Sequence, residues 1–487
     1  MEQHFANLKP ERLWFYFSQI LGIPHPSKKE EKIRDYLLEF AKTHSLQVNV
    51  DSTGNVLITK MASPGYESRM MVCLQGHMDM VCEKNSDVLH DFDADGIKTY
   101  LSEGWIKAKG TTLGADNGIA LAAMLAILED KSVSHGPLEC LFTVDEESGL
   151  TGAFGLEPDF LKSRILLNLD NEDEGQFCIG CAGGRDTNAR LPVEMLPVPD
   201  GYSAFQIRIS GLKGGHSGEQ IPDGLGNSIK ILTRILWMAN RKQSMELADI
   251  HGGNLRNAIP REAAALVVLP QIRSDEFLSE SHNLASDIQA EFKWTDPGLK
   301  ISFEAVSLPA EMISPKTTTR LLEVLYACPH GVLVMSPAIP GLVQTSTNLA
   351  TIHTENGVLT VGTSQRSAFE SQKTDVSNMV ASAFSLLGAE VKQSNGYPGW
   401  TPNPESKIKD ILVSTYKQTF SHQEPHVVAI HAGLECGLIG EKYPSMDMIS
   451  FGPTIKNPHS PDEKVEVESV ELFWKFLLEV LNAIPGN

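Results

Sequence analysis

The chain has 487 residues, of which 41% are hydrophobic and 21% charged, and its formal net charge is −20. This length implies at least two domains, the acidic balance argues against a nucleic-acid partner, and no apolar stretch is long enough to span a membrane. Seven scattered cysteines and a first segment without the layout of a secretory signal predict a cytoplasmic protein with reduced thiols.

The first part of the chain alternates between helices and strands. A helix is predicted over residues 27–40, opened by a capping box of Ser27 and Glu30, and another is predicted over residues 118–130. Short apolar runs predict buried strands at residues 55–60, 70–75, 138–144 and 165–169. This alternation predicts an α/β fold with a mostly parallel sheet sandwiched by helices.

The middle of the chain has a different pattern, which is typical of an α+β domain. The order strand, helix, strand, strand occurs over residues 204–269 and loosely recurs over residues 300–365, which suggests a duplicated unit. A Pro- and Gly-rich stretch at residues 395–406 precedes a return to the first pattern. We therefore predict a discontinuous domain made of residues 1–187 and 395–487, interrupted by an inserted domain of residues 188–394.

Acidic and histidine side chains follow the predicted strands, at the edge where α/β proteins bind their ligands. His77 and Asp79 come just after the strand at residues 70–75. The imidazole can bind a metal while the carboxylate two residues later hydrogen-bonds its other ring nitrogen, which fixes the tautomer. Taken alone, this H-x-D pattern also fits an ordinary surface histidine.

Two further acidic motifs occur where predicted elements begin or end. Asp116 stands where a loop meets the helix at residues 118–130, and it suits either capping that helix or bridging two metal ions. Glu146 and Glu147 are adjacent after the strand at residues 138–144, where paired carboxylates are costly unless a cation or water takes them up. They suit a metal ligand and a general base, or else a solvated turn.

Asp170 and His459 extend the set of candidate ligands. Asp170 follows the strand at residues 165–169, and His459 lies in a loop after an apolar run near the C-terminus. Together the candidates supply two imidazoles, three ligand carboxylates and a spare glutamate. Imidazole and carboxylate suit divalent metals such as zinc, and this inventory is typical of a two-metal hydrolase with ions about 3.5–4 Å apart.

The segments GHMDMV, GADNGIA, DEESG, LDNED and NPHSPDE resemble those of the aminoacylase/dipeptidase family of di-zinc metallopeptidases. The resemblance runs from the first helix to the C-terminus. It implies a zinc-exopeptidase-like catalytic domain, two Zn²⁺ ions per chain that Co²⁺ or Mn²⁺ can replace, and hydrolysis of unblocked dipeptides, including Xaa-His dipeptides such as β-alanyl-histidine. An N-acyl-amino-acid deacylase or tripeptidase on the same scaffold, and a catalytically inactive binding relative, are the alternatives.

The resemblance also implies roles for the matching residues. Five would bind the metals, with His77 and Asp170 on one zinc, Glu147 and His459 on the other, and Asp116 bridging the two. Asp79 would orient His77, and Glu146 would be the general base. A cis peptide bond is implied between Asp116 and Asn117.

Further residues are implied in the inserted domain, which would serve as a lid and dimerisation domain of a homodimer. His216, in a glycine-flanked loop, would donate to the reaction's oxyanion in its own or the neighbouring subunit. Asn257 and Arg366 match positions around the small peptide substrate, and an arginine suits a dipeptide's C-terminal carboxylate. Without the resemblance, these residues fit ordinary polar groups equally well. Gly433 would add backbone contacts, whereas His431 is interpreted as structural.

Overall fold

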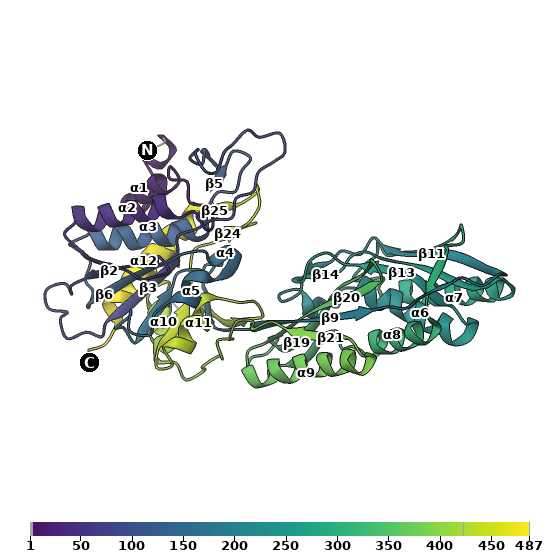
Figure 1. Cartoon of the computed structure of the whole chain (residues 1–487). Coiled ribbons are helices and arrows are strands. Elements are labelled where there is room, and N and C mark those ends of the chain that lie inside the picture. The colour runs from purple at the N-terminus through teal and green to yellow at the C-terminus, as the bar shows by residue number, and fades with distance from the viewer. Residues whose placement is uncertain (1–2, 422, 487) are drawn as a thin grey trace. The chain divides into compact units, whose positions relative to one another are not determined.

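A computed structural model describes residues 3–421 and 423–486 of the chain. The chain divides into two compact units, each with its own hydrophobic core (Figure 1). The first unit comprises Met1–Cys181, Trp400–Ala429 and Leu434–Asn487, and the second comprises Ala182–Gly399 and Ile430–Gly433. Every helix in the described part of the chain is too short or too polar to traverse a lipid bilayer.

The first unit is built around an eight-stranded sheet. In spatial order its strands are β1 (Gln47–Val50), β2 (Val56–Lys60), β6 (Leu138–Thr143), β3 (Val72–His77), β7 (Ile165–Asn168), β23 (Asp447–Ser450), β8 (Gln176–Cys181) and β22 (His426–Ile430). The central strands β6, β3, β7 and β23 are parallel, and β1, β2 and β8 pair antiparallel with their neighbours β2, β6 and β23. Every residue of β3, β6 and β7 is buried, as expected for parallel strands covered on both faces. The predicted α/β fold is confirmed.

Helices enclose the main core of this unit against the sheet. They are α1 (Glu11–Ile20), α2 (Glu31–Thr43), α3 (Ala115–Glu129), α10 (Lys407–Thr419) and α12 (Val467–Ala483). Helix α3 is rich in Ala, Leu and Ile on all sides and is buried along nearly its whole length, packed between α1 and β3. Shorter helices complete the unit: η1 (Gln3–Phe5), α4 (Glu146–Gly149), α5 (Thr151–Gly155) and α11 (Glu435–Lys442).

A small antiparallel sheet joins two distant parts of the first unit. Its strands, in spatial order, are β24 (Ile455–Lys456), β25 (Lys464–Glu466), β5 (Trp105–Ala108) and β4 (Thr99–Ser102). The pairing of β25 with β5 holds the loop that contains His459 beside the segment that leads into α3.

The predicted capping box at the start of α2 does not form. Helix α2 begins at Glu31, four residues later than expected. The Ser27 hydroxyl donates instead to the Asp79 carboxylate at 2.7 Å, and the Glu30 carboxylate accepts from the backbone N–H groups of Lys28 and Asp145. Both side chains are engaged by the strand-end loops, so they are not available to the helix.

The second unit is built on a nine-stranded antiparallel sheet. In spatial order its strands are β16 (Lys300–Val306), β11 (Tyr202–Ser210), β15 (Ala263–Pro270), β13 (Glu246–Gly252), β19 (Val343–Glu355), β20 (Val358–Ser367), β9 (Gly183–Pro192) and β21 (Glu390–Gln393), with β18 (Gly331–Met335) also pairing with β19. One face of the sheet packs on the helices α6 (Ser228–Gln243), α7 (Ser274–Glu291), α8 (Pro315–Ala327) and α9 (Glu370–Leu387).

The expected duplication is visible in the order of these elements. One copy runs β11–α6–β13–β15–α7–β16 and the other β9–α8–β19–β20–α9–β21, so each is a β-α-β-β-α-β unit of the ferredoxin-like kind. The copies meet where β13 pairs with β19. The second copy therefore begins at β9, before the first, and not at residue 300 as the strand pattern suggested. Strand β19 and helix α7 had not been predicted.

Short elements complete the second unit. Strand β10 (Met195–Pro197) pairs with β17 (Glu311–Ile313), and β12 (Gly215–His216) pairs with β14 (Ala258–Ile259). Single turns of 3₁₀ helix, η2 (Ile221–Asp223) and η3 (Gln271–Arg273), lie in the connecting loops.

Candidate metal centre

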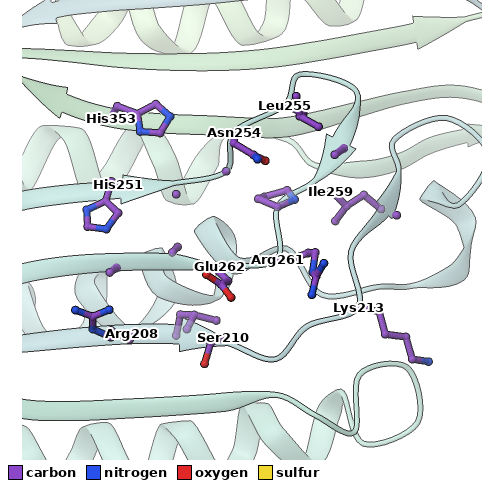
Figure 2. A pocket seen from close by; sticks show the side chains of 18 of the residues that line it. Arg208, Ser210, Lys213, His251, Asn254, Leu255, Ile259, Arg261, Glu262 and His353 are labelled. Carbon is purple, nitrogen blue, oxygen red and sulfur yellow. The ribbon is translucent and has the colours of Figure 1, made fainter. Parts of the chain in front are cut away.

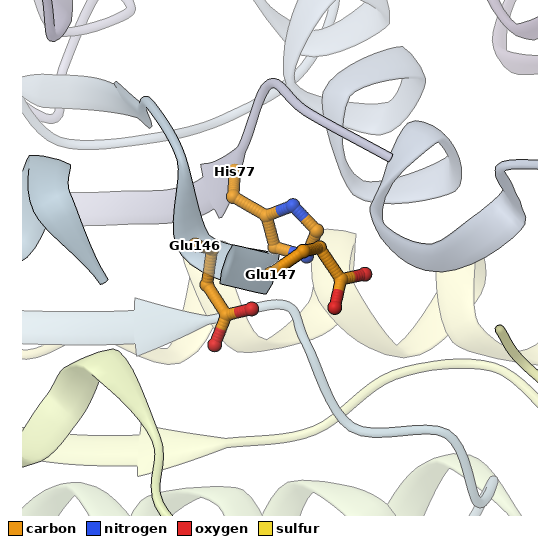
Figure 3. A group of neighbouring side chains, drawn as sticks. All are labelled: His77, Glu146 and Glu147. Carbon is orange, nitrogen blue, oxygen red and sulfur yellow. The ribbon is translucent and has the colours of Figure 1, made fainter. Parts of the chain in front are cut away.

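The candidate ligands of the first unit converge because parallel strands end at one edge of a sheet. His77 is the last residue of β3, and Glu146 and Glu147 open the short helix α4 just after β6 (Figure 3). Asp170 follows β7 by two residues. His459 lies between β24 and β25, in the segment that continues from β23.

Asp116 lies between the two histidines. Its Oδ1 is 3.1 Å from His77 Nε2, and its Oδ2 is 3.2 Å from His459 Nε2. The side chain of Asp116 is 11% exposed, that of His77 is 1% exposed and that of His459 is 51% exposed, so the cluster opens to solvent on the His459 side. The peptide bond between Asp116 and Asn117 is cis, as the resemblance implies.

Each histidine has a second carboxylate beside it. His77 Nε2 is 3.4 Å from Asp170 Oδ1, and His459 Nε2 is 3.0 Å from Glu147 Oε2. Potential ligand atoms of His77, Asp116 and Asp170 therefore lie within 4.8 Å of one another, and so do those of Asp116, Glu147 and His459. Two three-residue groups thus share Asp116, and either group can hold a metal ion.

Asp79 contacts more of the site than the H-x-D pattern indicates. Nδ1 of His77 is 3.0 Å from the Asp79 backbone carbonyl and 3.4 Å from its carboxylate. The same carboxylate accepts from the backbone N–H groups of Glu146 and Glu147 at 2.9 and 3.2 Å. Asp79 therefore orients the His77 ring largely through its main chain, and fixes the two glutamates through its side chain.

The crowding of acids changes the protonation of the whole cluster. Burial disfavours a charged His77, but the neighbouring Asp170, Asp116 and Asp79 carboxylates raise its pKa well above the ordinary value. Hydrogen bonds to Asp116 and Glu147 raise the pKa of His459 to about 11. The carboxylates thus draw positive charge onto both imidazoles, which is the electrostatic demand that a bound cation satisfies.

The donor set fits divalent metal ions. Glu147 Oε1 and Asp170 Oδ1 are buried and find no hydrogen-bond partner within residues 3–421 and 423–486. Unsatisfied carboxylate oxygens of this kind are costly unless an ion or water takes them up. The set comprises two imidazoles and three carboxylates, one of which is the shared aspartate. These groups match the ligand preferences of zinc and similar divalent metals.

Glu146 lies beside the cluster in a position suited to proton transfer. Its carboxylate forms a third close group with His77 and Glu147. Burial raises the pKa of the Glu146 carboxyl well above its ordinary value, and the negative charges of Asp170 and Glu147 raise it further. A carboxylate whose pKa is raised takes up a proton more readily than an exposed one, which suits a group that accepts and returns a proton.

One buried acid beneath this cluster escaped the sequence analysis. Glu435, at the start of α11, is fully buried and accepts hydrogen bonds from Gln75 Nε2 at 2.6 Å and Thr143 Oγ1 at 2.7 Å. Gln75 in turn accepts from Asn168 at 2.6 Å. This network ties the ends of β3, β6 and β7 together. Nothing in the spacing of its own segment, HAGLECG, assigns Glu435 to these strands.

The remaining predicted site residues belong to the second unit. His216 is on β12, Asn257 is exposed just before β14, and Arg366 is on β20 and only 7% exposed. The loop after His216 is held by a hydrogen bond from Ser217 N to the Asn257 carbonyl at 2.8 Å. The structure thus joins His216 and Asn257 through adjoining backbone.

Arg366 has a tyrosine hydroxyl as a hydrogen-bond acceptor. Its Nη1 donates to the Tyr397 hydroxyl at 3.0 Å, whereas its buried Nε has no partner, and no carboxylate forms an ion pair with the guanidinium, in the described parts of the chain. Burial and the Arg366 charge lower the pKa of His216 to about 4 and that of His431 to about 3. A buried guanidinium without a counter-ion is suited to an anionic ligand.

His431 also belongs to this group, although the sequence analysis interpreted it as structural. Its Nε2 and the Ser346 hydroxyl form a hydrogen bond of 2.7 Å, and its buried Nδ1 finds no partner within the described chain. A Cβ on Gly218 would lie 2.3 Å from the His431 carbonyl and 3.3 Å from Arg366 Nε. Only glycine therefore lets the loop after His216 approach this pair so closely.

A cavity of about 900 Å³ opens on the face of the second sheet that the helices leave uncovered (Figure 2). His216 and Asn257 line it, together with the basic side chains of Arg208, Lys213 and Arg261. His251 and His353 face each other across β13 and β19 along its wall. The second unit thus presents a basic surface within an acidic protein.

Comparison with known proteins bears on both units. The family model of "Peptidase family M20/M25/M40" matches residues 73–483. The cytosol non-specific dipeptidase of Escherichia coli (strain K12) is 42% identical over 482 residues, covering 99% of each chain.

Solved structures give the same picture. The aminoacylhistidine dipeptidase of Vibrio alginolyticus is 43% identical and matches all of this chain and 99% of its own, with a TM-score of 0.92. The aminopeptidase PepT of Bacillus cereus shares the fold at 16% identity, with a TM-score of 0.62 over 98% of this chain and 99% of its own. Since the family model spans most of the chain and a relative of 42% identity spans 99% of it, the chain belongs to peptidase family M20/M25/M40.

Proposed function

We propose that the protein is a metal-dependent dipeptidase that hydrolyses unblocked dipeptides, including Xaa-His dipeptides such as β-alanyl-histidine. The observation that carries the proposal is the position of Asp116, whose two carboxylate oxygens face His77 and His459 from opposite sides. The names of the two full-length relatives, a non-specific dipeptidase and an aminoacylhistidine dipeptidase, support the substrate class.

Two zinc ions, replaceable by cobalt or manganese, would be held by the two groups that share Asp116. His77 and Asp170 would bind one ion, and Glu147 and His459 the other. Bound in this way, the ions would supply Lewis acidity and would bring the pKa of a coordinated water toward neutrality.

Glu146 would carry the proton of the reaction. Its carboxylate takes a proton from the attacking water as the new C–O bond forms at the peptide carbonyl, and then delivers that proton to the leaving amine as the C–N bond breaks. Burial raises the pKa of the Glu146 carboxyl, which favours its protonated form and so suits a group that must hold the proton between the two steps. The Asp79 carboxylate holds the turn of Glu146 in place by accepting from the Glu146 backbone N–H.

Residues of the second unit would recognise the substrate. We propose that Arg366 binds the C-terminal carboxylate, since it is buried and its Nε has no hydrogen-bond partner in the described chain. His216 would donate to the oxyanion, and its low pKa keeps it a neutral donor. Asn257 would contact the peptide from the wall of the cavity.

The organisation of the chain extends the proposal. Residues 1–187 and 395–487 would form the catalytic domain, and residues 188–394 a lid and dimerisation domain of a cytoplasmic homodimer. The name of the E. coli relative supports the compartment. A solution mass of twice 53.3 kDa would support the dimer, and a mass of 53.3 kDa would contradict it.

One assay tests the activity. β-Alanyl-histidine, leucyl-histidine, a tripeptide and N-acetyl-methionine are offered side by side to the protein before chelation, after chelation and after zinc is returned. Rapid cleavage of the two dipeptides, lost on chelation and restored by zinc, is expected. Faster cleavage of the tripeptide or of the acylated amino acid would replace the proposal with a tripeptidase or a deacylase.

A further inference from the structure

Two proposed ligands lie on loops that the small antiparallel sheet brings together. Asp116 follows the loop that leaves β5, and His459 lies in the turn between β24 and β25. Strand β25 pairs with β5, with Val465 opposite Ile106, so the strand ends from which the two loops extend are held in a fixed position relative to each other. Beyond that pairing, the side chain of Glu463 also connects them.

Glu463 is a buried carboxylate, 2% exposed, that binds the backbone before Asp116. Its Oε2 accepts from the N–H groups of Leu113 and Gly114 at 2.7 and 3.0 Å. Its Oε1 accepts from those of Ala115 and Asp116 at 2.8 and 3.4 Å. Both oxygens are thus used, and all the donors lie in the short segment that ends at the shared aspartate.

This segment lacks a cap of its own. Gly114 occupies the N-cap position of α3 with φ +74°, and it has no side chain to accept from the first turn. Helix starts leave backbone N–H groups unsatisfied and favour a negative charge nearby. Glu463 supplies that charge from a loop more than three hundred residues later, only four residues after His459.

We propose that Glu463 is a positioning residue that fixes Asp116 relative to His459 before any metal binds, and thereby sets the affinity of the metal centre. The inference rests on the proposed ligand roles of Asp116 and His459. Partners that orient metal ligands commonly contribute about 10–100-fold to metal affinity. Because His459 serves only one of the two ions, the ion held by Glu147 and His459 should lose the most.

The chain offers a matched control in Glu139. This carboxylate is also 2% exposed and also accepts backbone N–H groups, from Lys162 at 3.0 Å and from Ser163 at 3.0 Å. It lies near the start of β6, whereas the candidate ligands follow the other end of that strand. Glu139→Gln should therefore perturb the loop at Lys162 and Ser163 without displacing the candidate metal ligands.

The test compares the zinc affinities of wild type, Glu463→Gln and Glu139→Gln by competition with a chromophoric chelator. The absorption spectrum of the cobalt-loaded proteins is recorded alongside. In Glu463→Gln an amide N–H₂ replaces one acceptor oxygen and faces backbone donors. We expect about 10–100-fold weaker zinc binding, a stoichiometry falling from two toward one as chelator increases, and an altered cobalt spectrum. Glu139→Gln should match the wild type in all three.

Unchanged zinc affinity in Glu463→Gln, or an equal loss in both variants, would overturn the inference while leaving the proposed function intact. A wild-type protein that binds no zinc would instead remove the proposed function, and the inference with it. If Glu463→Gln does not fold, the shorter Glu463→Asp variant is measured in the same way.

Hydrogen exchange of the wild type provides an independent reading. The amides of residues 113–116 should be protected in the metal-free protein, because the carboxylate already holds them. Rapid exchange of these amides without metal, and protection only after zinc is added, would overturn the inference.

Discussion

At the scale of single residues, Asp116 determines how the other acids behave. Hydrogen bonds from His459 and His77 outweigh burial and lower the pKa of its carboxyl below the ordinary value. Burial raises the pKa of the neighbouring Glu147 and Asp170 carboxyls. The imidazoles therefore favour the ionised form of Asp116, whereas burial disfavours the ionised forms of Glu147 and Asp170, which a bound cation would stabilise.

Replacing Glu146 by Gln should stop the reaction without emptying the metal centre. Neither group that shares Asp116 includes Glu146, so zinc content should stay at the wild-type level. Loss of the proton carrier should lower kcat by about 10²–10⁴-fold. Metal analysis and β-alanyl-histidine hydrolysis measure the two effects.

The matched control for this prediction is Glu157→Gln, which changes an exposed glutamate of the same unit and should retain full activity. A Glu146→Gln protein with wild-type kcat would exclude Glu146 as the base. Loss of zinc in that variant would make it a ligand instead.

His431 should make stability depend on pH. Burial, reinforced by Arg366, lowers its pKa to about 3, below the value of about 6.5 expected in the unfolded chain. The unfolded state then binds the extra proton, so this contribution is complete above pH 6.5 and is lost as the pH falls. Between pH 7 and 5 the wild type should lose about 2 kcal/mol more than His431→Asn.

Chemical denaturation of the metal-free proteins at both pH values measures this difference, because the other titrating groups are common to both. His282→Asn, which removes an exposed histidine of the same unit, should keep the wild-type slope. Identical pH slopes for wild type and His431→Asn would show that the residue does not titrate as described.

Sequence reasoning found the residues of the metal cluster because each follows a strand or opens a helix. The apolar pattern shows where each strand ends, and the carboxyl ends of parallel strands lie at the same edge of the sheet. Glu435 was missed, and His431 was interpreted only as structural, because neither stands at such a position. Their partners, Gln75 and Ser346, are distant in the chain, so only the fold reveals the contacts.

At the scale of elements, the close contact of β3 with α3 holds His77 and Asp116 together. Gly76 precedes His77, and a Cβ there would lie 2.2 Å from Asn117 Oδ1 and 3.2 Å from Ala120 Cβ. The Asn117 side chain is itself fixed, donating to the Leu169 carbonyl at 3.0 Å. The absence of a side chain at Gly76 therefore allows the helix to approach the strand.

Gly76→Ala should push α3 away from β3. Overpacking of this kind typically costs about 1–3 kcal/mol of unfolding free energy, and the shift should weaken zinc binding as well. Thermal melting and chelator competition measure the two effects. Gly486→Ala, whose Cβ would meet only the Ser68 carbonyl at 3.5 Å, is the control. An unchanged melting temperature and zinc affinity in Gly76→Ala would show that α3 can move to accommodate the added methyl group at little cost.

The fold class could be predicted from the sequence, but some element boundaries could not. The buried strands of the first unit are uniform apolar runs, which the pattern identifies directly. Helix α2 starts later than its capping signal because Ser27 and Glu30 are bound by strand-end loops. Strand β19 carries a run of Thr, Ser and Asn that conceals its buried character.

At the scale of the whole molecule, the two units have separate cores and should unfold separately. All the proposed metal ligands belong to the first. If zinc binds only the folded form of that unit, it should raise the unfolding temperature of that unit by mass action and leave that of the other unit unchanged.

Calorimetry of the metal-free and zinc-loaded protein measures both transitions. Gly76→Ala identifies the transition of the first unit, because it should move that one alone. A zinc-induced rise of both transitions by equal amounts would show that the units unfold as one.

In the second unit, the copy that runs from β11 to β16 is inserted within the other copy, and its two ends lie at the same place. Strand β10 precedes it and β17 follows it, these two strands pair, and Val198 N donates to the Ala310 carbonyl at 3.1 Å. An insertion whose ends already touch adds little more than one loop closure to the surrounding chain. Such a segment can be inserted or deleted during evolution without changing the path of the surrounding chain. Its removal would leave the end of β19 around Ile352 and His353 without the partner that β13 provides, open to a strand from elsewhere.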